Sequence, residues 1–200
     1  TGGAGQFGEV MLRVEPLPRG TGFEFVDEVK GGAIPGVFMA SVEKGVRQAL
    51  DDGVVGGFPV SDIRVIVYDG KSHAVDSKDI AFFTAGRKAV IEAIRAATPI
   101  ILEPVVDIEI LSPENAVGDL AGDLSGKRGQ VTGTQARGAG SMSISGKVPL
   151  AELDEYQGRL KSLTGGQGSY SIAFSHYAAV PVATQQQLAS QHKVVGLDDE

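Results

Sequence analysis

Cysteine occurs nowhere in the 200 residues. Its absence excludes disulfide bonds and thiolate metal sites and is compatible with a cytoplasmic protein, which we expect. The chain also lacks any run of about 18 apolar residues, so we expect no membrane span and no secretory signal. The three histidines, His73, His176 and His192, are too scattered for metal-ligand spacing, so we expect no metal site.

An excess of positive charge is lacking as well. The net charge is −7, whereas a dedicated nucleic-acid binder usually has a basic surface. This balance argues against such a binder and leaves open a local contact with RNA. Apolar residues make up 42% of the chain, which is enough for packed cores in one large or two small domains. Because the first residue is Thr1 rather than Met, we expect a piece of a longer protein.

The first half of the chain has the pattern of an α+β unit that ends near Ile101. Alternating apolar residues predict strands, and apolar residues at helical spacing predict helices. The predicted order is strand, strand, helix, strand, loop and helix, over residues 10–14, 23–29, 39–50, 60–68, 69–77 and 78–97. Ser77 is predicted to cap the last helix. Close packing of this helix on a sheet is favoured by the alanines at every fourth position from Ala81 to Ala97, which are flanked by Ile80, Phe83, Val90, Ile91 and Ile94.

The second half predicts a ferredoxin-like βαββαβ domain that begins at Glu103. Strands are expected over residues 106–110, 130–136, 142–148 and 170–174, and helices from Ser112-Pro113 and over 150–163. Gly138-Ala139-Gly140 is the expected turn between the two middle strands. In phase with the last strand, His176 is predicted to be partly buried. A polar tail follows, with a short helix over 185–192.

Two glycine-rich stretches resemble phosphate loops only superficially. Gly3 to Val10 contains G-x-G-x-x-G, but a strand follows it directly, where a dinucleotide fold needs a helix. A kinase would also need H-R-D and D-F-G motifs, and neither occurs. Gly122 to Arg128 is one residue short of a Walker loop and lacks its Ser or Thr.

The loop from Asp69 to Ser77 contains the chain's most reactive side chains. His73 with Asp76 and either Ser72 or Ser77 has the residue types of a hydrolytic triad. All of them lie in one short loop, however, and G-x-S-x-G is absent, so nothing fixes a base against a nucleophile. A non-catalytic protein-interaction module is the alternative that the residues alone favour.

A series of motifs in chain order resembles the fourth and fifth domains of elongation factor G. They are Gly2-Gly3-x-Gly5-Gln6-Phe7-Gly8, Gly31-Gly32-x-Ile34-Pro35-Gly36, His73-x-Val75-Asp76-Ser77, Leu102-Glu103-Pro104, Gly118-Asp119-x-x-Gly122-Asp123-Leu124-Ser125 and Leu160-x-Ser162-Leu163-Thr164. The resemblance implies an α/β-plait-type arm with a βαβ crossover, of the ribosomal-protein fold type, over residues 1–102. A ferredoxin-like domain over 103–180 and a tail over 181–200 would follow.

The resemblance implies the C-terminal part of a ribosome-associated GTPase that promotes translocation of tRNA and mRNA. The fragment itself would be no enzyme and hold no cofactor, since GTP and Mg would bind elsewhere in the full-length parent. Loops 3–8 and 70–77 would form the tip that contacts tRNA and mRNA. The implied contacting residues are Gly5, Gln6, Phe7, Gly8, Lys71, Ser72, His73 and Asp76.

The implied partners are the ribosome, through its rRNA and proteins, and tRNA and mRNA, with a monomeric protein and no membrane. Departures from the family pattern lie beside the tip histidine. The family commonly has Ser-Tyr where this chain has Lys71-Ser72, and often aspartate in place of Ala74. An arginine cluster is also replaced, by Gly126-Lys127-Arg128. These changes favour, as an alternative, a divergent paralogue acting in ribosome recycling or protection.

Overall fold

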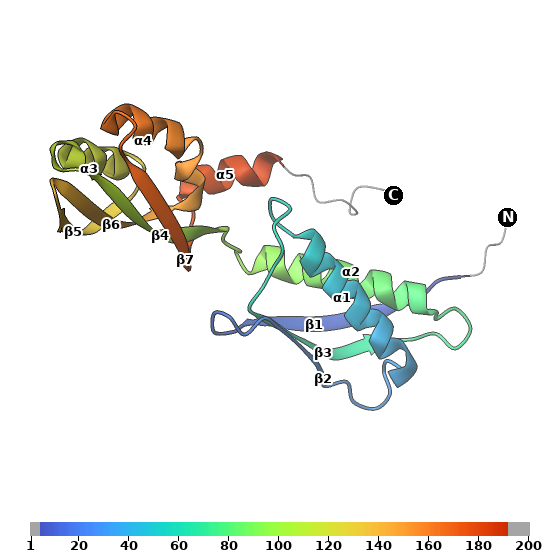
Figure 1. The fold of residues 1–200 in the computed structure, drawn as a ribbon. Coiled ribbons are helices and arrows are strands. Elements are labelled where there is room, and N and C mark those ends of the chain that lie inside the picture. The colour runs from blue at the N-terminus through green and yellow to red at the C-terminus, as the bar shows by residue number, and fades with distance from the viewer. Residues whose placement is uncertain (1–4, 192–200) are drawn as a thin grey trace. The chain divides into compact units, whose positions relative to one another are not determined.

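The computed structural model describes residues 5–191, and the chain divides into two compact units (Figure 1). Unit 1 runs through Ile101 and also includes the last helix, α5 (Val182–Gln191), while unit 2 comprises Leu102–Pro181. Both units combine helices with a β-sheet, which confirms the predicted α+β class. Within the described range, no helix is long and apolar enough to cross a membrane.

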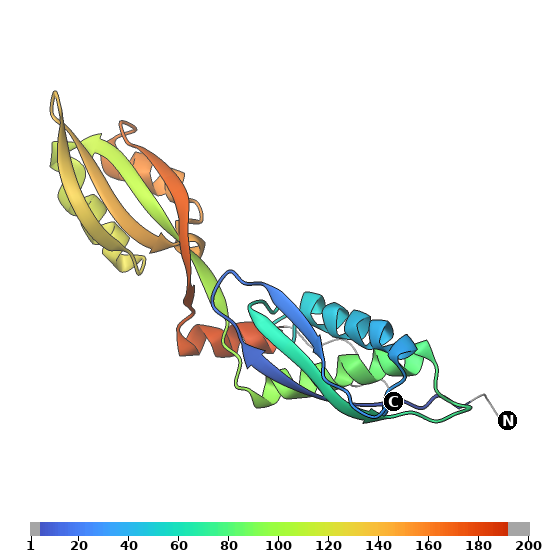
Figure 2. The same ribbon diagram turned by 90° about the horizontal axis from the view of Figure 1, so that it is seen from below.

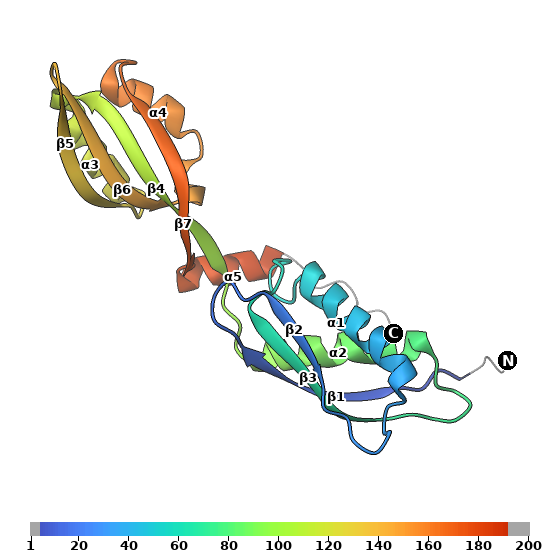
Figure 3. The same cartoon turned by 60° about the horizontal axis from the view of Figure 1, so that its bottom comes forward.

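The sheet of unit 1 has β3 as its middle strand (Figure 3). Its strands are β1 (Glu9–Pro16), β2 (Phe23–Asp27) and β3 (Ile63–Lys71). β1 runs antiparallel to β3, and β2 runs parallel to it. Because parallel strands need a long connection, the chain crosses over through η1 (Gly36–Phe38) and α1 (Met39–Asp52). The predicted βαβ crossover is thus confirmed.

Helices α1 and α2 (Asp79–Ala96) pack together and on the sheet of unit 1. Val46 of α1 and Phe82 of α2 are completely buried in the core that they share with Val65 of β3. A Cβ atom on Gly45 would lie 2.0 Å from the carbonyl oxygen of Phe83, so only glycine permits this close helix contact.

The packing face of α2 contains the predicted Val90, Ile91 and Ile94, but only Ala81 of the alanine stripe is buried in it. The buried residues of this helix are Ala81, Phe82, Gly86, Val90, Ile91 and Ile94. Ala85, Ala89 and Ala93 lie half-buried at the margin of this face. The larger side chains occupy the core because they remove more apolar surface from water than a methyl group does.

Strand β3 begins and ends later than predicted. It starts at Ile63, because the amide of Val60 donates to the carbonyl oxygen of Leu50 at the end of α1 instead of joining the sheet. It continues to Lys71, which pairs with Glu9 at the start of β1. Residues 69–71, assigned above to a loop, therefore belong to the strand.

Ser77 is not the cap of α2, contrary to the prediction. The helix begins at Asp79 after Lys78, and no side chain caps it. The Ser77 hydroxyl makes its hydrogen bonds within the loops instead, to His73 and Phe7.

Unit 2 has an antiparallel sheet with the strand order β5-β6-β4-β7, which confirms the predicted ferredoxin-like arrangement. Its elements are β4 (Leu102–Pro113), η2 (Glu114–Ala116), α3 (Val117–Gly126), β5 (Gln130–Gly138), β6 (Ser141–Pro149), η3 (Leu150–Leu153), α4 (Tyr156–Thr164) and β7 (Ser169–Ala179). Positive φ angles at Gly138, Ala139 and Gly140 form the expected turn. The core between sheet and helices includes Ile110, Leu120 and Leu160.

Three details of unit 2 differ from the sequence-based expectation. The helix predicted over 150–163 is interrupted at Glu155, whose φ of 53° is left-handed, so η3 and α4 are separate. Ser112 starts no helix, because it lies buried in β4 with its hydroxyl bonded to the carbonyl of Pro113. His176 is exposed rather than partly buried, because it lies on the edge strand β7.

Helix α5 is the short helix predicted for the tail, although it starts three residues earlier than expected. The backbone amide of Ile101 donates a hydrogen bond of 3.3 Å to the side-chain oxygen of Gln185 in this helix. His192 and the acidic C-terminal residues lie outside the described range, as do Gly3 and Ala4 of the first predicted tip loop.

Tyr156 is a buried phenol at the centre of unit 2. Only 1% of it is exposed, and neither its hydroxyl nor Oδ2 of Asp123 has a hydrogen-bond partner within the described residues. Burial, with a smaller effect of the Asp123 carboxylate, raises the pKa of Tyr156 to about 12. The folded state therefore holds this phenol in its neutral form more strongly than the unfolded chain does.

We predict that the free energy of unfolding falls less at alkaline pH in Tyr156→Phe than in the wild type. A raised folded-state pKa gives stability that is present below the unfolded value and is lost as pH rises toward the folded value. Between about pH 9 and about pH 11, the free energy of unfolding of the wild type should fall by about 1 kcal/mol more than that of the variant. Urea unfolding measures this difference. Tyr177→Phe, which removes an exposed phenol, should behave like the wild type.

Candidate functional site

The segment before β1 and the loop after β3 meet at one end of unit 1 (Figure 2). Phe7 forms the joint between them. Its amide donates to the carbonyl oxygen of Asp76 (2.9 Å), and its own carbonyl oxygen accepts from the Ser77 hydroxyl (3.0 Å). Both backbone groups of Phe7 are thereby used between segments that lie about seventy residues apart in sequence.

The loop after β3 is also closed on itself. The amide of His73 donates to Oγ of Ser77 (2.8 Å), and the amide of Ser77 donates to the carbonyl oxygen of His73 (3.1 Å). The amides of Val75 and Asp76 point at Nδ1 of His73, at 3.4 and 3.3 Å. The loop is therefore a compact turn built around one histidine.

The imidazole of His73 has two sets of partners on the same nitrogen. Nδ1 can accept from the two loop amides, or, when protonated, donate to Oδ2 of Asp76 at 3.1 Å. In both states Nε2 is not used by the loop, and 56% of the side chain is exposed. The ring lies edge-on to that of Phe7, with centroids 6.4 Å apart. His73 is thus fixed on one side and open on the other.

Glycines line the joint where side chains would not fit. A Cβ atom on Gly5 would lie 2.7 Å from the carboxylate of Asp76, and one on Gly8 would lie 3.2 Å from the backbone of Ala81 at the start of α2. These contacts explain why the first segment can lie so close to the second.

The remaining predicted contact residues point outward from this joint. Lys71 is 67% exposed and its Nζ lies 3.3 Å from the carboxylate of Glu9, its partner across the sheet. Gln6 and Ser72 are exposed and have no hydrogen-bond partner among the described residues. The predicted residues from Gly5 to Gly8 and from Lys71 to Asp76 therefore lie together at one end of the unit.

The arrangement does not assemble a hydrolytic triad. The Ser77 hydroxyl accepts from the backbone of His73 and donates to the carbonyl of Phe7, so it makes no bond to the imidazole. A serine nucleophile needs its proton within reach of the base. The groups offered here are instead donors, acceptors and ring faces, which suit contact with RNA.

Two kinds of site can be checked in the described part of the chain, a metal cluster and a Walker-type phosphate loop. Within the described part of the chain, no group of three or more His, Asp or Glu side chains could hold a metal ion. Gly122 and Gly126 lie in helix α3, whose amides bond within the helix and cannot cradle a phosphate as a Walker loop does.

Lys127 and Arg128, which stand where the family pattern has an arginine cluster, are engaged inside unit 2. Arg128 binds both carboxylate oxygens of Glu103, at 2.6 and 3.0 Å, and Glu152 at 2.7 Å. Lys127 donates to the carbonyl oxygen of Glu152. Both cations therefore stabilise the turn after α3.

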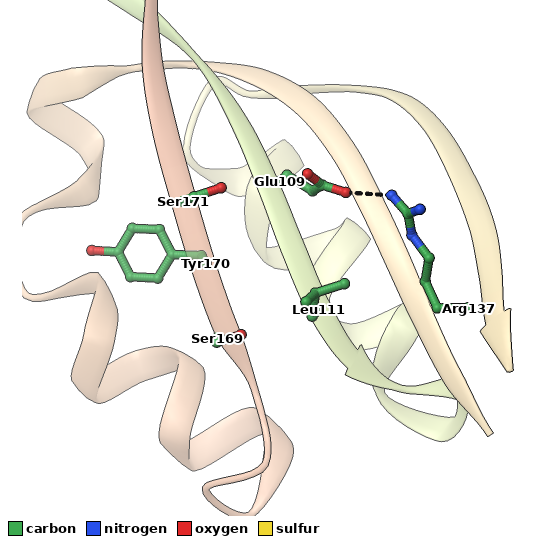
Figure 4. A pocket seen from close by; sticks show the side chains of 6 residues that line it. All are labelled: Glu109, Leu111, Arg137, Ser169, Tyr170 and Ser171. Carbon is green, nitrogen blue, oxygen red and sulfur yellow. Dashed lines mark hydrogen bonds and ion pairs between the residues drawn. The ribbon is translucent and has the colours of Figure 1, made fainter. Parts of the chain in front are cut away.

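A hollow lies on the sheet of unit 2, and none of its lining residues is a predicted site residue (Figure 4). It has a volume of about 380 Å³ and is lined by Glu109, Leu111, Arg137, Ser169, Tyr170 and Ser171. Oε1 of Glu109 accepts from both Ser143 and Arg137, each at 2.7 Å, and these bonds lower the pKa of its carboxyl. The charged groups of this hollow thus satisfy one another.

Comparison with known proteins matches each half of the chain to a family model. Residues 1–98 match the family model described as elongation factor G, domain IV, and residues 100–188 match that of the elongation factor G C-terminus. The chain belongs to the elongation factor G family. The resemblance in the sequence motifs is thereby confirmed.

Individual relatives agree with this assignment. An elongation factor G-like protein of Thermotoga maritima is 43% identical over 193 residues, which are 96% of this chain and 28% of that protein. Elongation factor G of Aquifex pyrophilus is 48% identical over 181 residues, 90% of this chain and 26% of that protein. A crystal structure from Thermus thermophilus is 40% identical with a TM-score of 0.79, and the match covers 96% of this chain and 28% of that one. The chain thus spans little more than a quarter of these relatives.

Ser77 belongs to the predicted tip loop 70–77 of this elongation factor G family member, but it is not among the predicted contacting residues. The sequence predicts Ser77 as a helix cap, because a serine just before a helical pattern is a common cap. Two signals are available in the sequence: Ser77 belongs to the motif His73-x-Val75-Asp76-Ser77, and its spacing of four residues from His73 allows the hydrogen bond to the His73 amide. Its contact with Phe7 depends on the pairing of β1 with β3 and has no local signal.

We predict that Gly5→Ala displaces the Asp76 side chain from His73. The added methyl group would stand 2.7 Å from the carboxylate, so this flexible side chain must rotate away. In the 200-residue chain, NMR should show altered His73 ring resonances and a normally folded core. Gly118→Ala is the matched control, because its methyl group meets nothing within 4 Å. Unchanged His73 resonances in Gly5→Ala would contradict the described joint.

Proposed function

We propose that the chain is the C-terminal part of a ribosome-associated GTPase that promotes translocation of tRNA and mRNA. The observation that carries this proposal is the joining of the two loops by Phe7, Asp76 and Ser77 at one end of unit 1. It gives a member of the elongation factor G family a single, firmly held tip in which Gln6, His73 and Lys71 face outward.

The tip acts by contact in the decoding region of the ribosome. The Gln6 amide offers two donors and an acceptor, and the free side of the His73 imidazole can donate to a 2′-hydroxyl or a phosphate, or stack on a base. Lys71 adds a cation for phosphate, and Gly5 and Gly8 let the backbone approach RNA closely. The arm occupies a site and prevents the tRNA from slipping back. It breaks no bond itself.

The GTPase reaction takes place outside these 200 residues. We assign GTP and Mg²⁺ to another part of the full-length protein. In support, the stretch that comes nearest to a Walker loop in sequence has Gly122 and Gly126 in helix α3. The partners of this part are rRNA and ribosomal proteins, together with tRNA and mRNA, and the protein works as a monomer in the cytoplasm. This proposal extends the family assignment, because the relatives are more than three times as long as the chain.

A divergent paralogue is the second candidate. The Thermotoga maritima relative is named an elongation factor G-like protein rather than elongation factor G. Lys71, Ser72 and Ala74 lie on both sides of His73 and alter the charge and size of the tip. A paralogue with this tip would act in ribosome recycling or ribosome protection. A translocation assay of the full-length protein beside the organism's other elongation factor G distinguishes the two candidates.

We predict that His73→Ala in the full-length protein slows translocation about tenfold and leaves ribosome-stimulated GTP hydrolysis largely intact. The loss corresponds to a hydrogen bond or stacking contact of about 1.4 kcal/mol at the tip. Rapid-kinetic translocation and GTP hydrolysis should be measured on the same ribosomes. His176→Ala, which removes an exposed histidine of β7, should match the wild type in both.

Two outcomes would contradict the role given to the tip. One is a collapse of GTP hydrolysis in His73→Ala, with unchanged translocation per GTP hydrolysed. The other is a full-length wild-type protein that does not bind ribosomes, which would favour a protein-interaction module.

A further inference from the structure

The Ser77 hydroxyl lies between the two segments that form the tip. It accepts the His73 amide at 2.8 Å and donates to the Phe7 carbonyl oxygen at 3.0 Å. A hydroxyl has one proton and two lone pairs, so a single group serves both loops at once. We infer that Ser77 is a positioning residue, which sets His73 and Phe7 in one geometry for contact with RNA. This inference rests on the proposed function.

The hydroxyl has no other structural task in the described residues. Helix α2 starts two residues later and is not capped by a side chain. Ser77 lies outside the hydrophobic core of unit 1. Removing its hydroxyl should therefore leave the helix and the core unchanged, and affect only the relation between the loops.

The other contacts of the joint are the packing of Gly5 and Gly8 and one further hydrogen bond, and none of them engages the carbonyl group of Phe7. Without the Ser77 hydroxyl, the loops are connected by the bond from the Phe7 amide to the Asp76 carbonyl. A single hydrogen bond through the Phe7 amide leaves the backbone of Phe7 free to rotate about that bond. A second bond through the Phe7 carbonyl oxygen fixes the direction of the backbone at this residue. The rings of Phe7 and His73 lie edge-on to each other, and we expect this contact to depend on that direction. Ser77 thus acts through Phe7 and His73 and does not itself need to touch RNA.

Ser77→Ala tests the inference first in the 200-residue chain. We expect the His73 amide to exchange with solvent about tenfold faster, and cross-relaxation between the Phe7 and His73 rings to disappear. Ser77→Thr keeps the hydroxyl and should retain both signals. Thr84→Ala, which removes an exposed hydroxyl bonded within α2, should leave the tip signals as in the wild type.

The functional arm uses the full-length protein. Ser77→Ala should slow translocation about five- to tenfold, as expected for one lost positioning hydrogen bond, and leave ribosome-stimulated GTP hydrolysis unchanged. Ser77→Thr keeps the hydroxyl and should retain the wild-type rate. A rate that is lost in Ser77→Ala and kept in Ser77→Thr assigns the effect to the hydroxyl group. His73→Ala is measured in parallel as the reference for a lost tip contact.

The outcomes separate the inference from the function on which it rests. If His73→Ala has no effect, the proposed function fails, and the role of Ser77 in translocation fails with it. If His73→Ala slows translocation and Ser77→Ala does not, only the inference is overturned. Retained ring cross-relaxation in Ser77→Ala also overturns it. Slowing by Ser77→Ala, recovery in Ser77→Thr and loss of the ring contact together support it.

Discussion

Pairing between β1 and β3 is the constraint on which the tip of unit 1 depends. The ladder ends where Glu9 meets Lys71, so the segments beyond both strands emerge side by side. Phe7 can then contact Asp76 and Ser77 at little further loss of chain entropy, because formation of the sheet already brings these distant segments together. Gly5 and Gly8 complete the fit by leaving room for the facing side chain and helix start. Hydrogen bonds and close packing hold the loops together among the described residues.

Inside the joint, backbone groups satisfy one another, whereas side chains remain available outside it. The amides of Phe7, His73 and Ser77 all have partners within the two loops. Buried or partly buried backbone groups without partners would cost stability, so this pairing allows an exposed loop to keep one shape. The side chains of Gln6 and His73 then project from a fixed base. Such a base suits a part that works by occupying a site rather than by chemistry.

Much of the fold follows from local patterns in the sequence. The predictions are wrong where contacts between distant segments determine the structure. Period-two and helical spacings predict the order of elements in both units, and the glycines around Ala139 predict their turn. The local pattern predicts that β3 ends at Tyr68, whereas the strand continues to Lys71, because the pairing of Lys71 with Glu9 is not a local property. The predicted packing face of α2 correctly includes Val90 beside the alanines but omits Phe82, whose large side chain is completely buried. His73 was found through its family motif, but the partners of Ser77 required the tertiary structure.

The return of α5 to unit 1 changes what counts as a separable part of this protein. The chain leaves unit 1 after Ile101, forms the whole of unit 2, and comes back at Val182. The two crossings are adjacent, because Leu102 pairs with Ala179 in the sheet of unit 2. Unit 2 is therefore an insertion within unit 1 in the topological sense. An isolated arm cut at the first crossing would lack one of its own helices, and joining α5 directly to Ile101 is the way to obtain it whole.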